Sequence, residues 1–334
     1  MKIWEKIKTK NNNNTITEYR FCGITLLHKE KTPIKKVWEF LALKITRKPI
    51  REIVFPANAQ AVVYEKLPSS KCKRVAIFAS FSANGKIADY VIYYLKELKK
   101  VCDAIVFVAD NPIFPKEVEK IKNLVCFAKF ERHREYDFGS YKRGYEYASE
   151  KGLLNNAEEL VLLNDSCFGP VFPLKDIFDE MSDKKCDFWG LTSNTDFQYH
   201  LQSFFLVFKK SIIKSGALSE FLQTVEKQVS QWGVIAKYET KLTQFLQNKG
   251  YICASFVPDE ISETNELFNK HHTKDKTHFP LTLMKKYHFP LIKVKVLNGA
   301  FKNTLMEKPE DALAFIEKQN PELFADIRKR LKIK

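Results

Sequence analysis

The chain has 334 residues, 45% of them hydrophobic, which is enough to bury a sizeable core in one large domain or two smaller ones. No apolar run reaches the roughly 18 to 20 residues that span a bilayer, so we expect no transmembrane helix. Residues 1–20 break into charges and asparagines before an apolar stretch can form, which argues against a signal peptide and predicts a cytoplasmic protein. The seven cysteines are scattered without a C-x-x-C pair, which predicts reduced thiols rather than zinc ligands or disulfides.

The net charge of +15 predicts an anionic partner, either nucleic acid, a phosphorylated substrate or an anionic membrane surface. Residues 1–70 hold 14 Lys or Arg against 6 Asp or Glu, and we interpret them as a basic N-terminal extension that associates with membranes. Between residues 31 and 55, cations are mixed with large apolar side chains such as Trp38 and Phe40. This mixture is typical of an amphipathic helix, lying either at a membrane surface or against the protein core.

From Arg74 onward the pattern changes. Apolar strands are predicted at 75–80, 104–110, 124–130 and 160–164, with helices at 87–101, 115–123 and 141–154 between them. Further strands are predicted at 187–192, 203–208 and 291–297, helices at 219–229 and 239–249, and two last helices that begin at Pro309 and Pro321. Strands without polar alternation, separated by helices, predict an α/β fold with a mostly parallel central sheet and helices on both faces.

Asn164, Asp165 and Ser166 follow the strand at 160–164, and Gly169 and Pro170 follow closely. Because ligands of open α/β sheets bind beyond the carboxyl ends of the strands, this segment is a candidate site. Mg²⁺ or Mn²⁺ could join Asp165 to a diphosphate, as nucleotide-sugar transferases of the GT-A type require. The usual motif is Asp-x-Asp, however, and a lone Asp can simply cap a turn, so metal binding stays open.

Two further segments carry candidate groups. Asp137 precedes a predicted helix whose first turns carry Lys142 and Arg143, groups suited to a phosphate and to sugar hydroxyls. A capped helix with a basic outer face is the alternative. Glu239 stands at a helix start, where an inverting GT-A enzyme places its general base, although an acidic residue there also favours the helix dipole.

Six segments, taken in order, resemble the rhamnan synthesis F family of bacterial polysaccharide glycosyltransferases: DFGSYKRGY, LVLLNDSCFGPVF, DFWGLTSN, HLQSFFLVF, YETKLTQFLQNKGY and FPLIKVKVL. The resemblance extends from about Arg74 to Asn298. It implies a GT-A-like transferase that moves rhamnose or a related sugar from a nucleotide donor onto a lipid-linked or growing surface polysaccharide. We expect the transferase domain at residues 71–300 and a helical segment at 301–334.

The resemblance also implies roles for individual residues. Glu239 would be the general base, and Gln202 and Ser203 would contact the acceptor. The donor would bind to Asp137, Gly139, Lys142, Asn164, Asp165, Ser166, Trp189 and Gly190. Asp165 and His278 are the candidate metal ligands. The sequence departs from the family at His133 and Glu135, where the family commonly has Asn and Gly.

These features predict a cytoplasmic glycosyltransferase at the inner face of the cell membrane, with a nucleotide sugar, a glycan acceptor and an anionic membrane surface as partners, and no nucleic acid. Two alternatives stay open. A non-catalytic scaffold of a polysaccharide assembly complex is compatible with the single Asp of the NDS segment. A nucleic-acid-binding protein is compatible with the charge, although no binding motif supports it.

Overall fold

The computed structural model describes residues 4–11, 14–21, 24–31, 36–40, 43–47, 53–68, 71–259, 275–299 and 307–332. The chain divides into two compact units, residues 1–54 and residues 55–334. Residues 55–68 therefore belong to the larger unit, whereas the N-terminal extension was predicted to end at residue 70. Among the described residues, no helix is both long and apolar enough to cross a membrane.

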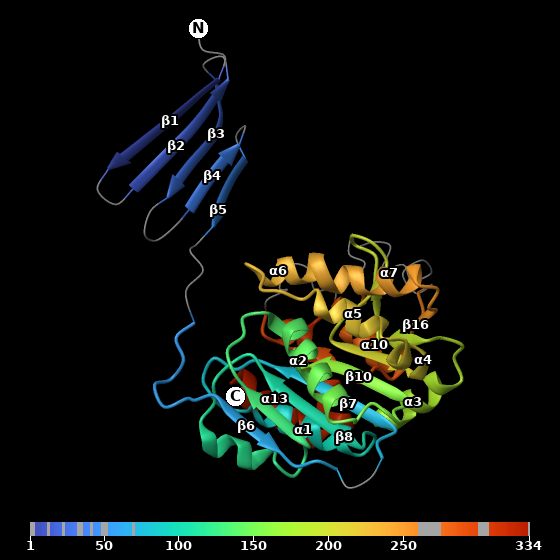
Figure 1. Ribbon diagram of the computed structural model, residues 1–334. Coiled ribbons are helices and arrows are strands. Elements are labelled where there is room, and N and C mark those ends of the chain that lie inside the picture. Colours follow the sequence, from blue (N-terminus) through green and yellow to red (C-terminus); the bar gives the residue numbers. More distant parts are fainter. Residues whose placement is uncertain are drawn as a thin grey trace. The chain divides into compact units, whose positions relative to one another are not determined.

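The N-terminal unit is a five-stranded antiparallel sheet in which each strand pairs with the next one in the chain (Figure 1). Its strands are β1 (Trp4–Asn11), β2 (Asn14–Phe21), β3 (Ile24–Lys31), β4 (Lys36–Phe40) and β5 (Leu43–Arg47). The helix predicted between residues 31 and 55 is therefore wrong. Val37, Trp38 and Ile45 are residue types that favour strands, and a neighbouring strand supplies the backbone hydrogen bonds that a helix would make internally.

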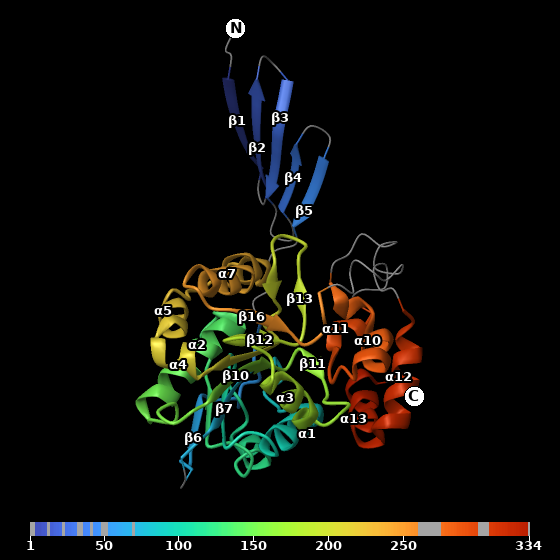
Figure 2. The same ribbon diagram turned by 90° about the vertical axis from the view of Figure 1, so that its right-hand side faces the viewer.

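The larger unit contains an eight-stranded sheet in the order β16-β12-β15-β10-β7-β8-β9-β6 (Figures 1 and 2). The strands are β6 (Val62–Glu65), β7 (Arg74–Ser80), β8 (Ala104–Ala109), β9 (Phe127–Phe130), β10 (Glu159–Asn164), β12 (Phe188–Gly190), β15 (Phe205–Lys209) and β16 (Cys253–Ser255). Strands β7 to β10 are parallel, as are β12 and β16, whereas β15 and β6 pair antiparallel with their neighbours. The predicted α/β class with a mostly parallel sheet is confirmed.

The strand order reverses between β7 and β10. The chain adds β8 and β9 on one side of β7 and then returns to place β10 on the other side. In open α/β sheets such a reversal leaves a crevice beyond the carboxyl ends of the two strands, where ligands bind.

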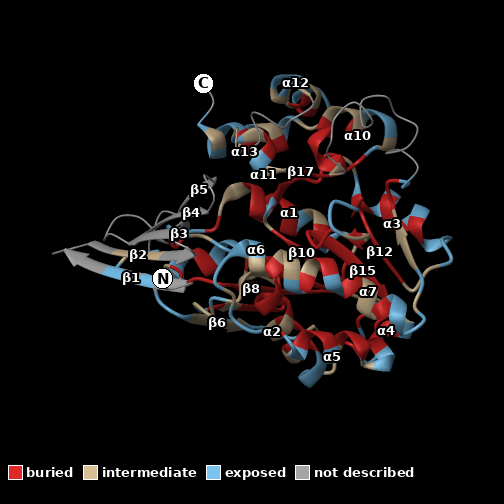
Figure 3. Ribbon diagram, turned by 90° about the horizontal axis from the view of Figure 1, so that it is seen from above, coloured by how far each residue is buried: buried red, intermediate tan, exposed pale blue. Residues whose placement is uncertain are grey.

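Helices cover both faces of this sheet (Figure 3). One face carries α1 (Asp89–Lys99), α3 (Leu174–Ser182), α10 (Pro280–Tyr287), α12 (Pro309–Gln319) and α13 (Pro321–Leu331). The other carries α2 (Tyr136–Glu150), α4 (Lys210–Ser215), α5 (Ala217–Gln223) and α7 (Thr240–Asn248). The short helix predicted at 115–123 is a 3-10 helix, η1 (Pro115–Lys120).

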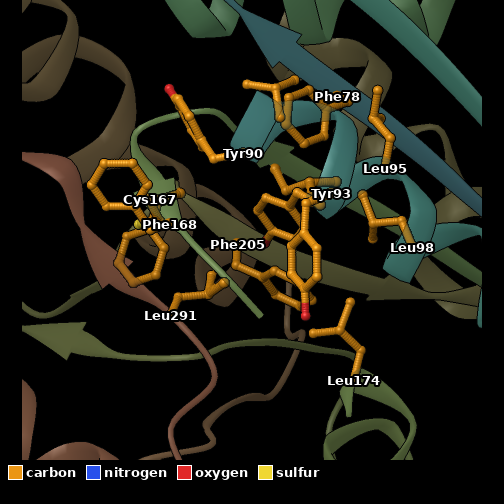
Figure 4. Packing of buried hydrophobic residues seen from close by; sticks show 14 of the residues in the cluster. Phe78, Tyr90, Tyr93, Leu95, Leu98, Cys167, Phe168, Leu174, Phe205 and Leu291 are labelled. Carbon is orange, nitrogen blue, oxygen red and sulfur yellow. The ribbon is translucent and has the colours of Figure 1, made fainter. Parts of the chain in front are cut away.

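Strand β7 shows why its sequence has no polar alternation. Ala76 and Phe78 face the core on the α1 side, and Val75 and Ile77 face the core on the α2 side. Phe78 lies among Tyr93, Leu95 and Phe205 in Figure 4, and its ring stacks on Phe107 of β8 with centroids 5.5 Å apart. Both faces of the strand are buried, so apolar residues are required at successive positions.

Two elements differ from their predicted bounds near the candidate site. The segment 291–297 forms the short strand β17 (Ile292–Lys293), which pairs with β11 (Cys167–Phe168), and then a helical turn, α11 (Val294–Leu297). Its prediction as a single strand is wrong, because after Lys293 the backbone bonds to itself as in a helix, with the Asn298 amide donating to the Val294 carbonyl (3.0 Å). Helix α2 begins at Tyr136 rather than 141, so Asp137 lies in its first turn.

Candidate functional site

The Asn164–Asp165–Ser166 turn lies at the carboxyl end of β10, beside the carboxyl end of β7. Oδ2 of Asp165 accepts hydrogen bonds from the hydroxyl of Ser80 (2.7 Å) and the amide of Phe81 (2.9 Å). These bonds tie Asp165 to the segment that leaves β7, across the reversal in strand order. Burial raises the pKa of the Asp165 carboxyl, because the site is less favourable for charge than water is.

Gly169 allows the segment after this turn to pack closely on residues 290 and 291. Its φ of +141° is rare for residues with a side chain, and a Cβ there would lie 2.6 Å from both the Pro290 carbonyl oxygen and Leu291 Cδ2. The following peptide bond, to Pro170, is cis. Glycine is therefore required at this position by both conformation and space.

A cavity of about 630 Å³ opens on the β7 side of the turn; we call it the larger cavity. The loop after β7, the start of α1 and the end of α13 contribute to its wall. Phe81, with 41% of its surface exposed, also lines it. The charged residues in the wall are Lys86, Lys120, Lys329, Arg330 and Lys332 against Asp89, Asp165 and Asp326. The excess of cations favours an anionic ligand such as a diphosphate.

A second cavity, of about 330 Å³, is lined by Asn164 and Ser166 of the same turn; we call it the smaller cavity. The predicted general base, Glu239, and the predicted acceptor contacts, Gln202 and Ser203, line it together with Asp137. The structure thus gathers residues that are far apart in the sequence. The turn contributes Asp165 to one cavity and its two neighbours to the other.

Asn164 connects Asp137 to the turn. Its Nδ2 donates to Oδ2 of Asp137 (3.1 Å), and its Oδ1 accepts from the amide (3.1 Å) and hydroxyl (2.6 Å) of Ser166. Burial raises the pKa of Asp137 to about 6, and the negative charge of Glu239 contributes to this shift. Asp137 can therefore exchange a proton close to neutral pH.

Glu239 is the last residue of a π-helical turn, η2 (Ile235–Glu239), a distortion that is frequent at functional sites. Its Oε2 accepts hydrogen bonds from the amide (3.0 Å) and hydroxyl of Ser203, and its Oε1 lies 3.8 Å from Nε2 of His200. The other ring nitrogen of His200, Nδ1, donates to the Gln198 carbonyl (2.8 Å). Ser203 thus fixes one carboxylate oxygen of Glu239, and the imidazole of His200 lies near the other oxygen.

Asp275, Lys293 and Lys295 also line the smaller cavity, and Oδ2 of Asp275 lies 3.6 Å from Nζ of Lys293. Burial alone would favour the neutral amine, but the carboxylates of Asp275 and Glu239 raise the pKa of Lys293 overall. Lys293 therefore supplies a positive charge among the carboxylates of Asp137, Glu239 and Asp275.

The family model for rhamnan synthesis protein F matches residues 105–319, which is well over half of the chain. This chain belongs to that family. Virulence protein VirA of Vibrio anguillarum (strain ATCC 68554 / 775) is 26% identical over 143 residues, which are 41% of this chain and 44% of that protein. Uncharacterized protein y4gN of Sinorhizobium fredii (strain NBRC 101917 / NGR234) is 25% identical over 131 residues, 38% of this chain and 34% of that protein. The aligned region thus spans less than half the length of these curated relatives.

Membership of the rhamnan synthesis F family supports a role in polysaccharide synthesis. The matched region includes α2, β10 and η2, and with them Asp137, Asp165 and Glu239. Helix α13 lies beyond it, so Arg330 of the larger cavity comes from outside the matched region.

The other predicted donor residues line neither cavity. Trp189 is fully buried, with ring centroids 5.6 Å from Phe178 and 5.8 Å from Phe205. A Cβ on Gly190 would approach Leu201 and Leu206 to 3.2 Å, and one on Gly139 would approach Glu135 Cβ to 2.2 Å. Nζ of Lys142 donates to the Val225 carbonyl (3.3 Å). In this structure these residues make core and helix contacts.

The two predicted metal ligands do not share a cavity. Asp165 lines the larger cavity, whereas His278 is buried in η3 (Lys276–His278) and lines neither. Within the described part of the chain, no three His, Cys, Asp or Glu side chains form a group that could hold a metal ion. His271 and His272, which the sequence favours as solvent-exposed loop residues rather than metal ligands, lie outside the described residues.

Several cavity residues were not predicted. Phe81 and Arg330 of the larger cavity and His200, Asp275 and Lys293 of the smaller one were assigned no role. A usable signal existed for Lys293, which together with Lys295 interrupts an otherwise apolar strand prediction. Arg330 gave no such signal, because a basic residue in the last turn of a helix is common in any helical protein.

Proposed function

We propose that this chain is a glycosyltransferase of GT-A type that moves a sugar, rhamnose or a related one, from a nucleotide-sugar donor to a lipid-linked or growing polysaccharide. The observation that carries the proposal is the placement of the Asn164–Asp165–Ser166 turn between two cavities. The reversal of strand order at β7 and β10 supports a ligand site at this edge of the sheet.

The larger cavity suits the nucleotide diphosphate. Its cations would neutralise the charge that develops as the diphosphate leaves, and the exposed ring of Phe81 offers a face for the base. A divalent ion suited to oxygen ligands, Mg²⁺ or Mn²⁺, fits Asp165 better than it fits His278. Asp165 would hold such an ion, which would supply positive charge to the diphosphate.

The smaller cavity suits the reacting sugar and the acceptor hydroxyl. In the proposed reaction, the acceptor oxygen bonds to the anomeric carbon, the bond from that carbon to the diphosphate oxygen breaks, and the hydroxyl proton passes to Glu239. Ser203 orients the carboxylate of Glu239 through two hydrogen bonds. Once the donor has entered, the positive charge of Lys293 would offset the negative charge of the carboxylates in the smaller cavity.

Nucleotide release tests the proposal. The purified protein is incubated with a panel of nucleotide sugars, with and without lipid-linked glycan, and free nucleotide is measured. We expect release from one donor, increased by the acceptor and lost in Asp165→Ala. Absence of release from every donor by a protein that still binds glycan would favour the scaffold alternative, and salt-sensitive retention of RNA or DNA on a filter would favour nucleic-acid binding.

The proposal extends to where the protein works. An acceptor carried by a lipid lies at a membrane, and Lys6 and Lys8 on β1 of the N-terminal unit are exposed cations of the kind that an anionic leaflet attracts. We therefore propose a peripheral position on the inner face of the cell membrane.

A further inference from the structure

Two exposed aromatic side chains meet at the smaller cavity. Phe197 and Trp232 are 66% and 62% exposed, and both line this cavity. Their ring centroids are 5.8 Å apart and the ring planes are inclined by 85°. Large apolar side chains are normally buried, because exposing apolar surface to water is unfavourable. A pair held at the wall of a polar cavity is therefore a candidate contact surface for a ligand.

The segments that carry the two rings are each fixed by hydrogen bonds. Phe197 lies between β13 (Ser193–Asn194) and β14 (His200–Leu201), where Oδ1 of Asn194 accepts from the Asp196 amide (2.7 Å) and Nε2 of Gln198 donates to the Thr240 carbonyl (2.5 Å). Trp232 lies on α6 (Gln231–Val234), whose first turn is capped by Ser230, which accepts from the Gly233 amide (3.2 Å). Hydrogen bonds thus hold in place the backbone segments that carry both aromatic rings.

The groups around the rings indicate what would bind. Asn194, His200, Gln202 and Gln231 line the same cavity and provide hydrogen-bond donors and acceptors, and Nζ of Lys295 donates to Oε1 of Gln231 (3.2 Å). A saccharide ring combines hydroxyl groups at its edge with C–H groups on its faces. The C–H groups carry partial positive charge and are attracted to the negative face of an aromatic ring.

We infer that Phe197 and Trp232 form an aromatic platform for a pyranose residue of the acceptor glycan, and that this platform determines acceptor affinity. The inference rests on the proposed function, because it places the acceptor in the cavity that contains Glu239. A membrane surface is less compatible with these two rings, because they stand beside polar residues in a cavity rather than on the apolar face of an amphipathic helix.

Calorimetric titration of the full chain with three trisaccharides, built of rhamnose, glucose or N-acetylglucosamine, tests the platform. We expect at least one to bind, Trp232→Ala and Phe197→Ala to weaken that binding about tenfold, and Trp232→Tyr to restore most of it. Ile252→Ala is the matched control, because Ile252 is 60% exposed and lines neither cavity. Nucleotide release in the absence of acceptor should be unchanged in Ile252→Ala, which lies outside both cavities.

The outcomes separate this inference from the proposed function. If a trisaccharide binds in a way that depends on Trp232 but no donor releases nucleotide, the aromatic platform is supported and the proposed transferase activity is contradicted. Nucleotide release together with equal trisaccharide affinity in wild type and Trp232→Ala would overturn the platform alone. The platform is also overturned if no trisaccharide binds at millimolar concentration, or if Trp232→Ala instead abolishes sedimentation with phosphatidylglycerol vesicles.

Discussion

Ser203 donates two hydrogen bonds to one oxygen of Glu239, from its amide over 3.0 Å and from its hydroxyl. Ser203 lies just before β15 and Glu239 ends the π-helical turn, so the contact joins the central sheet to the segment that precedes α7. A carboxylate fixed in this way at a cavity wall is well placed to receive a proton.

Replacing Glu239 by Gln keeps the shape and removes the basicity. If Glu239 is the general base, kcat should fall by roughly 10² to 10⁴ while the Kd of the donor stays nearly unchanged, because the interaction matters mainly in the transition state. Single-turnover kinetics and donor titration measure the two effects. Glu226→Gln, at an exposed residue paired with Lys237, is the control. Near-normal turnover of Glu239→Gln would direct attention to Asp137 as the base.

Asp165→Asn keeps a hydrogen-bond acceptor for Ser80 and Phe81 but removes the charge. If Asp165 holds the diphosphate through a divalent ion, the variant should bind the donor at least tenfold more weakly, and EDTA should weaken wild-type binding similarly. Donor titration with and without EDTA measures this. Full wild-type affinity in EDTA would mean that the cations of the larger cavity, rather than a metal ion, neutralise the diphosphate.

Asp137→Asn should change how stability depends on pH. Burial raises the pKa of Asp137 to about 6 in the folded protein from its ordinary value of 3.8, so between these values the folded state binds more protons than the unfolded state. Stability contributed by this residue therefore falls as pH rises from about 4 to 7. Relative to wild type, the Asn variant should gain in Tm over this range, and Asp179→Asn, at an exposed residue, should not. A difference in Tm between wild type and Asp137→Asn that does not change with pH would contradict a raised pKa for Asp137.

Gly169→Ala should destabilise the larger unit by about 1–3 kcal/mol, because it combines a disfavoured φ of +141° with contacts of 2.6 Å to Pro290 and Leu291. Urea unfolding measures the change. Gly216→Ala should cost less, because Gly216 has a φ of +75°, in the left-handed region, and no atom within 4 Å of the added Cβ. Equal losses in the two variants would contradict an added cost from the close contact and the φ of Gly169.

Charge reversal on β1, Lys6→Glu with Lys8→Glu, should weaken sedimentation with anionic vesicles, and the wild-type interaction should weaken as salt is added. The two lysines are exposed, so the change should leave the fold intact. Neutral phosphatidylcholine vesicles and a nucleic-acid filter assay are the controls. Unchanged sedimentation of the double variant would remove these lysines as a membrane contact.

Much of the larger unit follows from local patterns. The runs around Val75, Ile105 and Leu160 are apolar at every position because both faces of their strands are buried, and in a parallel sheet the connecting helices provide that cover. The same reasoning placed Asp165 at a strand end, where the sheet meets solvent. The burial of these strands and the position of Asp165 depend on residues close by in the chain, so they can be predicted from the sequence.

The sheet of the N-terminal unit and the two cavities depend on distant residues. The pieces that contain Trp38 and Ile45 are too short for periodicity to separate helix from strand, and pairing with the neighbouring strands decides the outcome. Trp189 matches a family motif yet lies in the core, because Phe178 and Phe205 enclose it. Arg330 and Lys293 reach their cavities only through the packing of α13 and the pairing of β17 with β11. Local sequence is enough to place Asp165 at the end of its strand. The charges around it come from distant elements brought together by packing, because electrostatic interactions depend on distance in space rather than along the chain.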